Sequence, residues 1–410
     1  MLPYTTRKDP VMSLFSSVEQ APADPILGLT EAFVADTRPT KVNLGVGVYL
    51  DANGKVPLLE CVRVAEHALA QAEKPRSYLP IDGMPAYVAA VKELVFGAES
   101  ELVAQGRVVT VQALGGTGGL RIGAGLLALS NPGSTVLVSN PSWENHQALF
   151  SRAGFPVATY RYYDAVSRRV DVDGMVADLE AAAPGTIVVL HARCHNPTGY
   201  ELSPADWDRV IATVGARGLV PYLDMAYQGF AEGISEDAYV VGKVVEAGLD
   251  FLVATSFSKS FSLYGERVGG LSVVTSSAEE AKRVLSQLKV VIRTLYSSSP
   301  THGAAIVAHV LNDPQLRALW ESELGGMRDR IKAMRSGLVA GLKAAGVTDD
   351  MSFITDQVGM FSYSGLTKDQ MVRLRSEFGV YGTDSGRLCI AALNDANIGY
   401  VSEAVAAVLR

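Results

Sequence analysis

The stretch TIVVLHARCHNPTGYELSPADWDRVIATVGARGLVPYLD, residues 186–224, contains two strand-like runs joined by a helical pattern. The runs TIVVLH and GLVPYLD are almost continuously apolar, as strands buried on both faces are. Between them Ser203 is suited to cap a helix, Pro204 to its first turn and Asp206 to the box position. Apolar residues then recur at helical spacing until Gly218. A strand, a helix and a strand in this order indicate a parallel βαβ unit.

The same alternation extends outward from this unit. The runs VVTVQAL (108–114), STVLVS (134–139) and DFLVATS (250–256) also read as strands, and a helix-like segment follows the first of them. We therefore predict an α/β fold whose large domain is a mostly parallel sheet with helices on both faces.

The C-terminal part has a different pattern. The runs MFSYS (360–364) and RLCIAAL (387–393) read as strands, and Thr367 is suited to cap a helix through Phe378 with Gln370 in the box position. These features predict a second, smaller α/β domain. Near the N-terminus, Asn53-Gly54 between the extended runs of residues 42–59 predicts a hairpin that we assign to the same small domain.

Composition excludes several classes of protein. The formal net charge is −7 without clustered Lys and Arg, so a nucleic-acid footprint is not expected. The cysteines, Cys61, Cys194 and Cys389, show no CxxC spacing and are predicted to be free thiols. No apolar run approaches the roughly 18 residues of a membrane span, and the first residues do not resemble a secretory signal. We expect a soluble, cytoplasmic protein without a metal site, whose natural start could be Met12.

Polar segments follow the predicted strands, and ligands bind at the carboxyl edge of open parallel sheets. These segments are GGTGG (115–119), NPSWENH (140–146), HNPTG (195–199), DMAYQGF (224–230) and SFSKS (256–260). Together they supply a phosphate cradle, an aromatic plate, an amide, a carboxylate, a phenol and a lysine. Pyridoxal phosphate needs this combination: a lysine to bind it, an acid beside its ring nitrogen, and backbone N–H groups, hydroxyls and an arginine around its phosphate.

Each segment alone also has a structural explanation. GGTGG could be a plain glycine turn, Asn196-Pro197 a turn, and Asp224 the cap of a helix over MAYQGF. Tyr227 and Trp143 could simply be core residues. A dinucleotide-binding pattern counted from Gly116 fails because Arg121 occupies its last position.

The conjunction of these motifs with SFSKSFSLYGERVGG (256–270) and SGR (385–387) resembles the class I, fold-type-I aspartate and aromatic amino acid aminotransferases. The resemblance extends from APADPILGL (21–29) to the C-terminus and is greatest to the bacterial aromatic (tyrosine) branch. It implies a seven-stranded large domain, pyridoxal 5′-phosphate as cofactor, and homodimers with shared active sites. We accordingly divide the chain into an N-terminal extension (1–20), an arm with part of the small domain (21–56), a large cofactor-binding domain (57–330) and a small domain (331–410).

The resemblance also implies a role for each site residue. Lys259 resembles the Schiff-base lysine that shuttles a proton, Asp224 the partner of the pyridine nitrogen, and Trp143 the residue stacked on the ring. Tyr227 and Asn196 resemble the residues that hold the cofactor's phenolic oxygen. The phosphate set comprises Gly116, Thr117, Ser256, Ser258 and Arg267, with Tyr78 donated across the dimer interface. Arg387 resembles the clamp on the substrate α-carboxylate, Arg293 the arginine that enters the neighbouring site to bind a side-chain carboxylate, and Gly47 part of the segment that closes over substrate.

Two further expectations concern reactivity and specificity. Because Arg267 and a pyridinium would lie close to Lys259, the pKa of that lysine should be lowered. The apolar Leu50 and Val56 and the small Ser298 favour a dual enzyme. Such an enzyme would accept Phe, Tyr and the larger Trp as well as Asp and Glu, with 2-oxoglutarate as acceptor in a ping-pong reaction.

Three alternatives stay open: a strict aspartate aminotransferase, a β-decarboxylase or lyase using the same cofactor, and a non-enzymatic binder. Two residues depart from the family pattern. Arg193 stands where a small residue or cysteine is expected, and Asp384 stands beside the expected α-carboxylate clamp, where it would weaken substrate binding or point outward.

Overall fold

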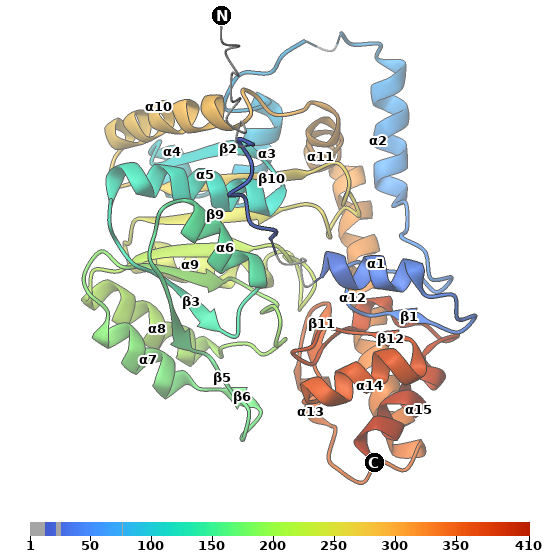
Figure 1. The fold of residues 1–410 in the computed structure, drawn as a ribbon. Helices are drawn as coiled ribbons and strands as arrows, with labels where there is room; N and C mark the ends of the chain where they lie inside the picture. The colour runs from blue at the N-terminus through green and yellow to red at the C-terminus, as the bar shows by residue number, and fades with distance from the viewer. Residues whose placement is uncertain (1–12, 22–25, 76) are drawn as a thin grey trace, which may run out of the picture.

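The computed structural model describes residues 13–21, 26–75 and 77–410. Its central element is a seven-stranded sheet in the order β2–β10–β9–β8–β7–β3–β4 (Figure 1). Every strand runs parallel to the others except β10, which is antiparallel to both neighbours. The strands are β2 (Val108–Leu114), β3 (Val136–Asn140), β4 (Val157–Arg161), β7 (Ile187–His191), β8 (Val220–Met225), β9 (Phe251–Ser256) and β10 (Val268–Val274). The predicted α/β class and mostly parallel sheet are confirmed.

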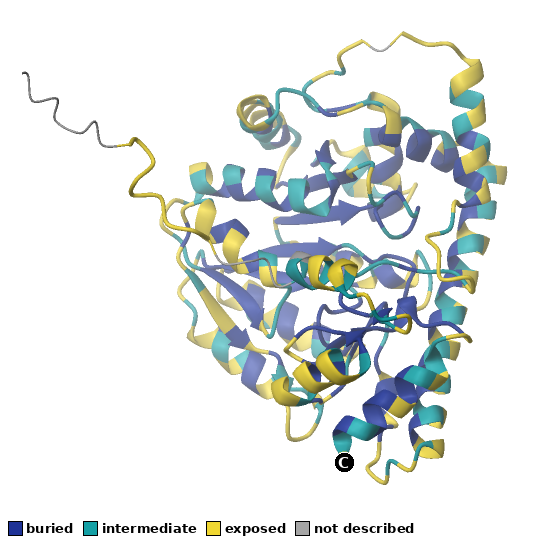
Figure 2. Cartoon of the chain, turned by 45° about the vertical axis from the view of Figure 1, so that its right-hand side comes forward, coloured by how far each residue is buried: buried dark blue, intermediate teal, exposed yellow. Residues whose placement is uncertain are grey.

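Two hydrophobic cores lie on opposite faces of this sheet because successive side chains of a strand alternate between its faces. On β9, Leu252 and Ala254 join one core, whereas Phe251 and Val253 join the other. The first core packs against α5 (Gly115–Ser130), α6 (Glu144–Arg152) and α10 (Ala278–Leu295). The second packs against α3 (Pro85–Phe96), α7 (Val172–Ala181), α8 (Pro204–Ala216), α9 (Tyr239–Glu246) and α11 (His302–Asn312). Figure 2 shows the result: buried strands and helices whose outer faces are exposed.

The helix signals in the sequence are realised locally. Ser203 begins α8 with a reciprocal capping box to Asp206, and Thr367 does the same for α14 (Lys368–Phe378) with Gln370. One boundary differs from the prediction. The helix after β2 begins at Gly115, so GGTGG forms its first turn and not a loop before it.

A smaller group of elements, from both ends of the chain, lies beside the sheet (Figure 1). The short strand β1 (Val42–Asn43) pairs in parallel with β12 (Val380–Tyr381), and β11 (Phe361–Tyr363) pairs antiparallel with β13 (Arg387–Cys389). Around them lie α1 (Leu27–Ala35), α13 (Phe353–Asp356), α14, the 3₁₀ turn η2 (Ile390–Ala392) and α15 (Ile398–Leu409).

Two strand predictions in this region were wrong in extent. The hairpin over residues 42–59 is reduced to its turn: the Asp51 N–H donates to the Lys55 carbonyl over 2.7 Å, and Gly54 adopts a φ of 72°. Among the described residues its flanks form no ladder with each other, because β1 pairs with β12 instead. The run RLCIAAL leaves the extended conformation after Cys389, where η2 begins.

The long helix α12 (Pro314–Ala344) connects the two groups of elements. It contacts α2 (Glu60–Gln71) and α11 near its beginning and α13 and α15 further along. The division expected between residues 330 and 331 therefore falls inside a helix. The remaining elements are α4 (Glu101–Ala104), β5 (Tyr163–Asp164), β6 (Arg169–Val170) and η1 (Glu236–Ala238).

The cysteines, the apolar character of the helices and the N-terminal residues concern where in the cell the protein was expected to act. The three cysteines are unpaired, as predicted, and all three are buried. Within the described residues no helix combines the length and the apolar character needed to cross a membrane. The possible start at Met12 and residues 22–25 of the expected arm lie outside the described residues.

Candidate active site

A cavity of about 400 Å³ opens at the carboxyl edge of the sheet, where β2, β7, β8 and β9 end. Its wall combines residues from these strand ends with residues from the smaller group of elements. All the predicted site residues line it except Tyr78 and Arg293; those present are Gly47, Gly116, Thr117, Trp143, Asn196, Asp224, Tyr227, Ser256, Ser258, Lys259, Arg267 and Arg387.

Tyr78 and Arg293 lie elsewhere on the chain. Tyr78 is 96% exposed, and Arg293 is exposed at the end of α10, where its guanidinium donates to the Ser297 hydroxyl. Neither side chain lines the cavity of its own subunit, which is the position required if each acts in a neighbouring subunit.

Lys259 lies three residues beyond the end of β9 and is partly buried. Its Nζ atom lies 5.0 Å from the centre of the Tyr227 ring. Burial lowers the pKa of Lys259 to about 8, with further lowering by the Arg267 and Arg387 guanidiniums and opposition from Asp224. The predicted direction is confirmed, although burial is a larger cause than the expected effect of Arg267.

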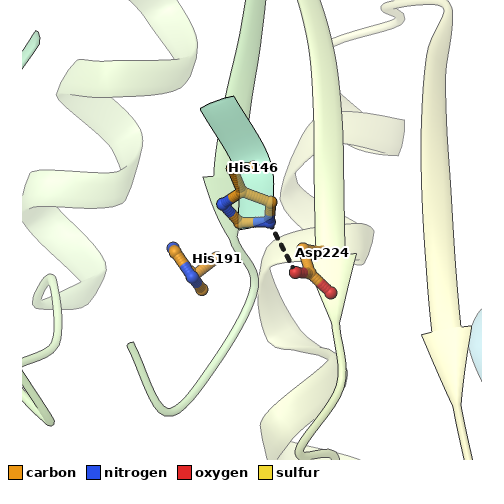
Figure 3. A group of neighbouring side chains, drawn as sticks. All are labelled: His146, His191 and Asp224. Atoms are coloured by element: carbon orange, nitrogen blue, oxygen red, sulfur yellow. Dashed lines mark hydrogen bonds and ion pairs between the residues drawn. The ribbon is translucent and has the colours of Figure 1, made fainter. Parts of the chain in front are cut away.

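Asp224, near the end of β8, is held by a histidine from α6 (Figure 3). Its Oδ2 atom lies 2.9 Å from His146 Nε2, and His146 Nδ1 lies 2.9 Å from the Ser142 hydroxyl. When His146 donates its Nε2–H to the Asp224 carboxylate, its Nδ1 atom is free to accept the hydrogen bond from the Ser142 hydroxyl. Burial acts to raise the pKa of Asp224, but the His146 hydrogen bond and neighbouring charges hold it below its ordinary value. Asp224 therefore remains an anion in the cavity wall.

The helix-cap alternative for Asp224 is wrong, since residues 226–231 form turns and not a helix. His191 lies directly opposite Asp224 in the β7–β8 register, and both of its ring nitrogens lack a hydrogen-bond partner (Figure 3). Burial and the adjacent His146 lower the pKa of His191 to about 3, so this ring is neutral at physiological pH. His191 lines the cavity beside Asp224.

An anion-binding cradle lies at the N-terminus of α5. Gly116 and Thr117 occupy its first turn, where unpaired N–H groups and the helix dipole favour negative charge. Ser258 accepts from Arg267 Nη1 over 3.3 Å, and Ser256 Oγ lies 3.3 Å from Ser258 Oγ. These hydroxyls and the guanidinium line the same cavity as the helix start.

Two glycines permit this close approach. A Cβ atom on Gly115 would lie 2.8 Å from Arg267 Nη2, and Gly115 also has a φ of 69°. A Cβ atom on Gly269, in β10, would lie 2.4 Å from the Gly115 carbonyl carbon. Gly269 therefore allows β10 to pass directly beside the cradle.

Arg387 supplies the second guanidinium of the cavity and comes from β13. It is 1% exposed, donates from Nη1 to Asn196 Oδ1 over 3.0 Å and from Nη2 to the Gly45 carbonyl over 2.7 Å. Its buried Nε atom has no hydrogen-bond partner among the described residues. A buried donor without a partner is costly, so Arg387 offers an unsatisfied N–H to an incoming acceptor.

Sequence reasoning missed two aromatic residues of the wall, Phe361 and Tyr264. The Arg387 guanidinium lies 4.4 Å from the Phe361 ring centre, and a Cβ atom on Gly47 would lie 2.6 Å from Phe361 Cζ. Tyr264 accepts the Tyr49 N–H over 2.9 Å. Pairing of the predicted strand MFSYS with that containing Arg387 would have been the signal for Phe361.

The other residues considered from sequence lie outside the cavity lining. His195 is hydrogen-bonded to Ser139 and Thr198 and stacks on Tyr162, which explains it as a packed core residue. Asp384 points away and lies 3.1 Å from Arg375. The residues used to argue specificity, Leu50, Val56 and Ser298, do not line the cavity of a single chain.

Comparison with known proteins agrees with this geometry. The family model for class I and II aminotransferases matches residues 39–405. The chain belongs to this aminotransferase family. It is 59% identical to an aspartate aminotransferase of Pseudomonas aeruginosa and 48% identical to an aromatic-amino-acid aminotransferase of Escherichia coli K12. Each match covers 97% of this chain and 100% of the relative.

Solved aminotransferase structures have the same fold. The aromatic-amino-acid aminotransferase of Burkholderia pseudomallei, whose structure is covalently bound to pyridoxal phosphate, is 62% identical with a TM-score of 0.95. The match covers 97% of this chain and 100% of that one. The fold-type-I prediction is thereby confirmed, and the lyase and non-enzymatic alternatives lose their support among these aminotransferase relatives.

Proposed function

We propose that this chain is a pyridoxal phosphate-dependent aminotransferase that moves the amino group of aromatic and dicarboxylic amino acids to 2-oxoglutarate in a ping-pong reaction. One observation carries the proposal: a lysine of lowered pKa, a buried carboxylate and a buried arginine with an unpaired donor line one cavity. The lysine supplies the nucleophilic amine that binds the cofactor, and the carboxylate supports the ring that acts as electron sink. The arginine is suited to bind the carboxylate of an amino acid.

The residues present fit pyridoxal phosphate. Gly116, Thr117, Ser256, Ser258 and Arg267 would hold its phosphate at the helix start, and Lys259 would bind it covalently. Asp224 would hold a proton on the ring nitrogen, and Tyr227 and Asn196 would contact the phenolic oxygen, with Trp143 against the ring. When bound, the cofactor supplies an electron sink for the carbanion formed at the substrate α-carbon.

The chain's own groups then position the amino acid and move its proton. Arg387 would bind the α-carboxylate through its free Nε–H and its fork, with Asn196 fixing the orientation of the guanidinium. The Lys259 amine is neutral above about pH 8, the value of its lowered pKa, and its Nζ atom lies 5.0 Å from the centre of the Tyr227 ring. This atom is therefore suited to take the α-proton. Gly47 and Phe361, which pack against each other in the cavity wall, would exclude water from this step.

A homodimer with shared sites forms part of the proposal. Tyr78 and Arg293 are exposed on their own subunit, and Arg293 lies near the exposed apolar residues Val290 (56% exposed) and Leu295 (41%) of α10. In a neighbouring site Tyr78 would add a phosphate ligand, and Arg293 would bind the side-chain carboxylate of Asp or Glu. The division into domains at residues 57–330 and 331–410, and a cytoplasmic location consistent with three free thiols, are proposed with it.

Dual specificity is supported by the relatives, whose names divide between aspartate and aromatic aminotransferases. The runner-up is a strict aspartate aminotransferase, which the relative from Pseudomonas aeruginosa favours by its name.

Steady-state transamination separates these two functions. With purified holoenzyme and 2-oxoglutarate, Asp and Phe should both be donors, with kcat/KM values within about tenfold of each other. A value for Phe lower by about three orders of magnitude would establish the strict aspartate enzyme. Lys259→Ala is the control for background transfer, and the absence of transfer from either amino acid by the wild-type enzyme would refute the aminotransferase proposal.

A further inference from the structure

Arg193 forms a largely buried ion cluster beside the loops that carry Asn196 and Tyr227. Its side chain is 15% exposed and meets three carboxylates. Nη1 lies 3.5 Å from Glu201, Nε lies 3.3 Å from Asp237, and Nη2 pairs with Glu232. Glu201 and Asp237 are 17% and 0% exposed, whereas Glu232 is 61% exposed and solvated.

The two buried acids hold the backbones of the two site loops. Glu201 Oε1 accepts the His195 N–H over 3.0 Å, immediately before Asn196. Asp237 accepts the N–H groups of Gly229, Ala231 and Glu232 over 2.8, 3.0 and 3.1 Å, in the segment that follows Tyr227. Arg193 is thus the cation common to both loops.

The electrostatic balance of the cluster depends on this one guanidinium. Burial raises the pKa of Glu201 to about 7 and also raises that of Asp237, while Arg193 opposes both shifts. Removing one member of a buried ion pair leaves an uncompensated charge, which a loop relieves by moving toward water or by taking up a proton. Either response disturbs the backbone that carries Asn196 or Tyr227.

We propose that Arg193 is a positioning residue for the amino-transfer site: it holds the Asn196 loop and the Tyr227 loop in register through Glu201 and Asp237. The proposal rests on the function proposed above. Its link to substrate is the Asn196 Oδ1 atom, which orients Arg387 over 3.0 Å. Displacement of the Asn196 loop would therefore weaken carboxylate binding although Arg193 does not line the cavity.

Arg193→Met tests this with two measurements on holoenzyme: kcat/KM for Asp, and the Kd of succinate, a dicarboxylate without an amino group, by calorimetry. We expect kcat/KM to fall about 10- to 100-fold, since a small misplacement from a remote change can have this effect, and succinate affinity to fall with it. Arg209→Met is the matched control, because Arg209 is 50% exposed and pairs with Asp173, which is 88% exposed. That variant should match the wild type.

Rescue distinguishes positioning from general stability. Glu201→Gln keeps an oxygen acceptor for the His195 N–H but removes the buried charge, so Arg193→Met/Glu201→Gln should recover succinate affinity to within about fivefold of wild type. If Arg193→Met alone fails to fold, the succinate affinity of this double variant tests the proposal. A double variant that does not fold, or that remains more than about fivefold weaker, overturns the proposal.

Two other results would also overturn it. One is an Arg193→Met enzyme with both parameters within about twofold of wild type. The other is a lowered melting temperature with kcat/KM and succinate affinity unchanged in the folded enzyme. Failure of the function itself would be seen separately, as absent transamination by the wild type.

Discussion

At the residue scale, the site depends on pKa values set by burial and by neighbouring charges. Asp224 remains charged because His146 supports it, and Lys259 loses its proton easily because it is buried near two guanidiniums. Both pKa values are lowered, which keeps the Asp224 carboxylate charged and favours the neutral Lys259 amine. Perturbed pKa values of this kind are typical of sites that run acid–base chemistry. The following two predictions depend on these groups.

The Lys259 amine should set the pH dependence of cofactor capture. Below its folded pKa of about 8 the amine is an ammonium and cannot attack an aldehyde, and above it the neutral nucleophile dominates. The rate at which cofactor-free enzyme binds pyridoxal phosphate covalently should therefore rise with pH and level off above about 8, as followed by stopped-flow absorbance. Lys259→Ala should show no covalent phase. A midpoint near the ordinary lysine value of about 10.4 would contradict the assignment.

Asp224→Asn should lower kcat/KM for Asp by about 10- to 100-fold. A charge-assisted hydrogen bond is worth about 1.5–3 kcal/mol, and about 1.36 kcal/mol corresponds to a factor of ten. The control Asp173→Asn changes a carboxylate that is 88% exposed and should leave kcat/KM unaltered. Equal activity of the two variants would show that the carboxylate of Asp224 has no part in the reaction.

Residues at strand ends could be predicted from sequence, but their partners could not. Lys259, Asp224 and Asn196 follow apolar strands, and the motif SGR points to Arg387. Phe361 under Arg387 and the His146–Asp224 hydrogen bond join segments far apart in the chain. No local pattern specifies such contacts, because they arise from the order of strands in the sheet and from the packing of the smaller group on it.

At the element scale, capping residues and apolar runs correctly predicted helices and strands, but the sequence did not predict which strands pair. The box at Ser203 and the five sheet strands read from sequence are present. The strands β4 and β10 were missed. The glycines of β10 carry little strand propensity. The hairpin failed because β1 finds a more distant partner, β12. Local propensity fixes a turn, but tertiary context decides which strand lies beside it.

The close packing of β10 on α5 predicts opposite effects for two Gly→Ala substitutions. Gly269→Ala would place a Cβ atom 2.4 Å from Gly115, so it should destabilise the chain by about 1–3 kcal/mol. Gly242 lies exposed within α9, and a Cβ atom added there would meet no atom within 4 Å. Gly242→Ala should therefore stabilise the chain by up to about 1 kcal/mol through helix propensity. Urea unfolding midpoints should fall for the first variant and rise for the second. A midpoint for Gly269→Ala at or above that of the wild type would contradict this account of β10.

At the scale of the whole molecule, the cavity is formed by the sheet and the smaller group together, while two proposed site residues point away from it. Asn196 comes from the sheet and Arg387 from β13, and their hydrogen bond joins the two parts. Family resemblance, and not residue pattern, predicted that Tyr78 and Arg293 act in a partner subunit. Both side chains are exposed on the single chain, as that prediction requires.

Subunit complementation tests the shared site. Enzymes made only of Lys259→Ala chains or only of Arg293→Ala chains should each have low activity with Asp. When the two chains are co-expressed, each mixed dimer has one site that retains both Lys259 and the Arg293 of the other chain. Random pairing gives about a quarter of the wild-type sites, so activity should recover to about that level. Activity equal to the sum of the separate variants would place Arg293 outside the neighbouring site.

The most direct test of the central claim is a single-turnover reaction without 2-oxo acid. Holoenzyme is mixed in turn with Asp, Glu, Phe, Tyr and Trp, and the absorbance of the cofactor is followed as its pyridoxal form converts to the pyridoxamine form. We predict conversion with Asp and Glu and also with Phe and Tyr, to the same amplitude, because one cavity serves all of them. Absence of conversion with every amino acid would contradict aminotransferase activity, and conversion with Asp and Glu alone would contradict dual specificity.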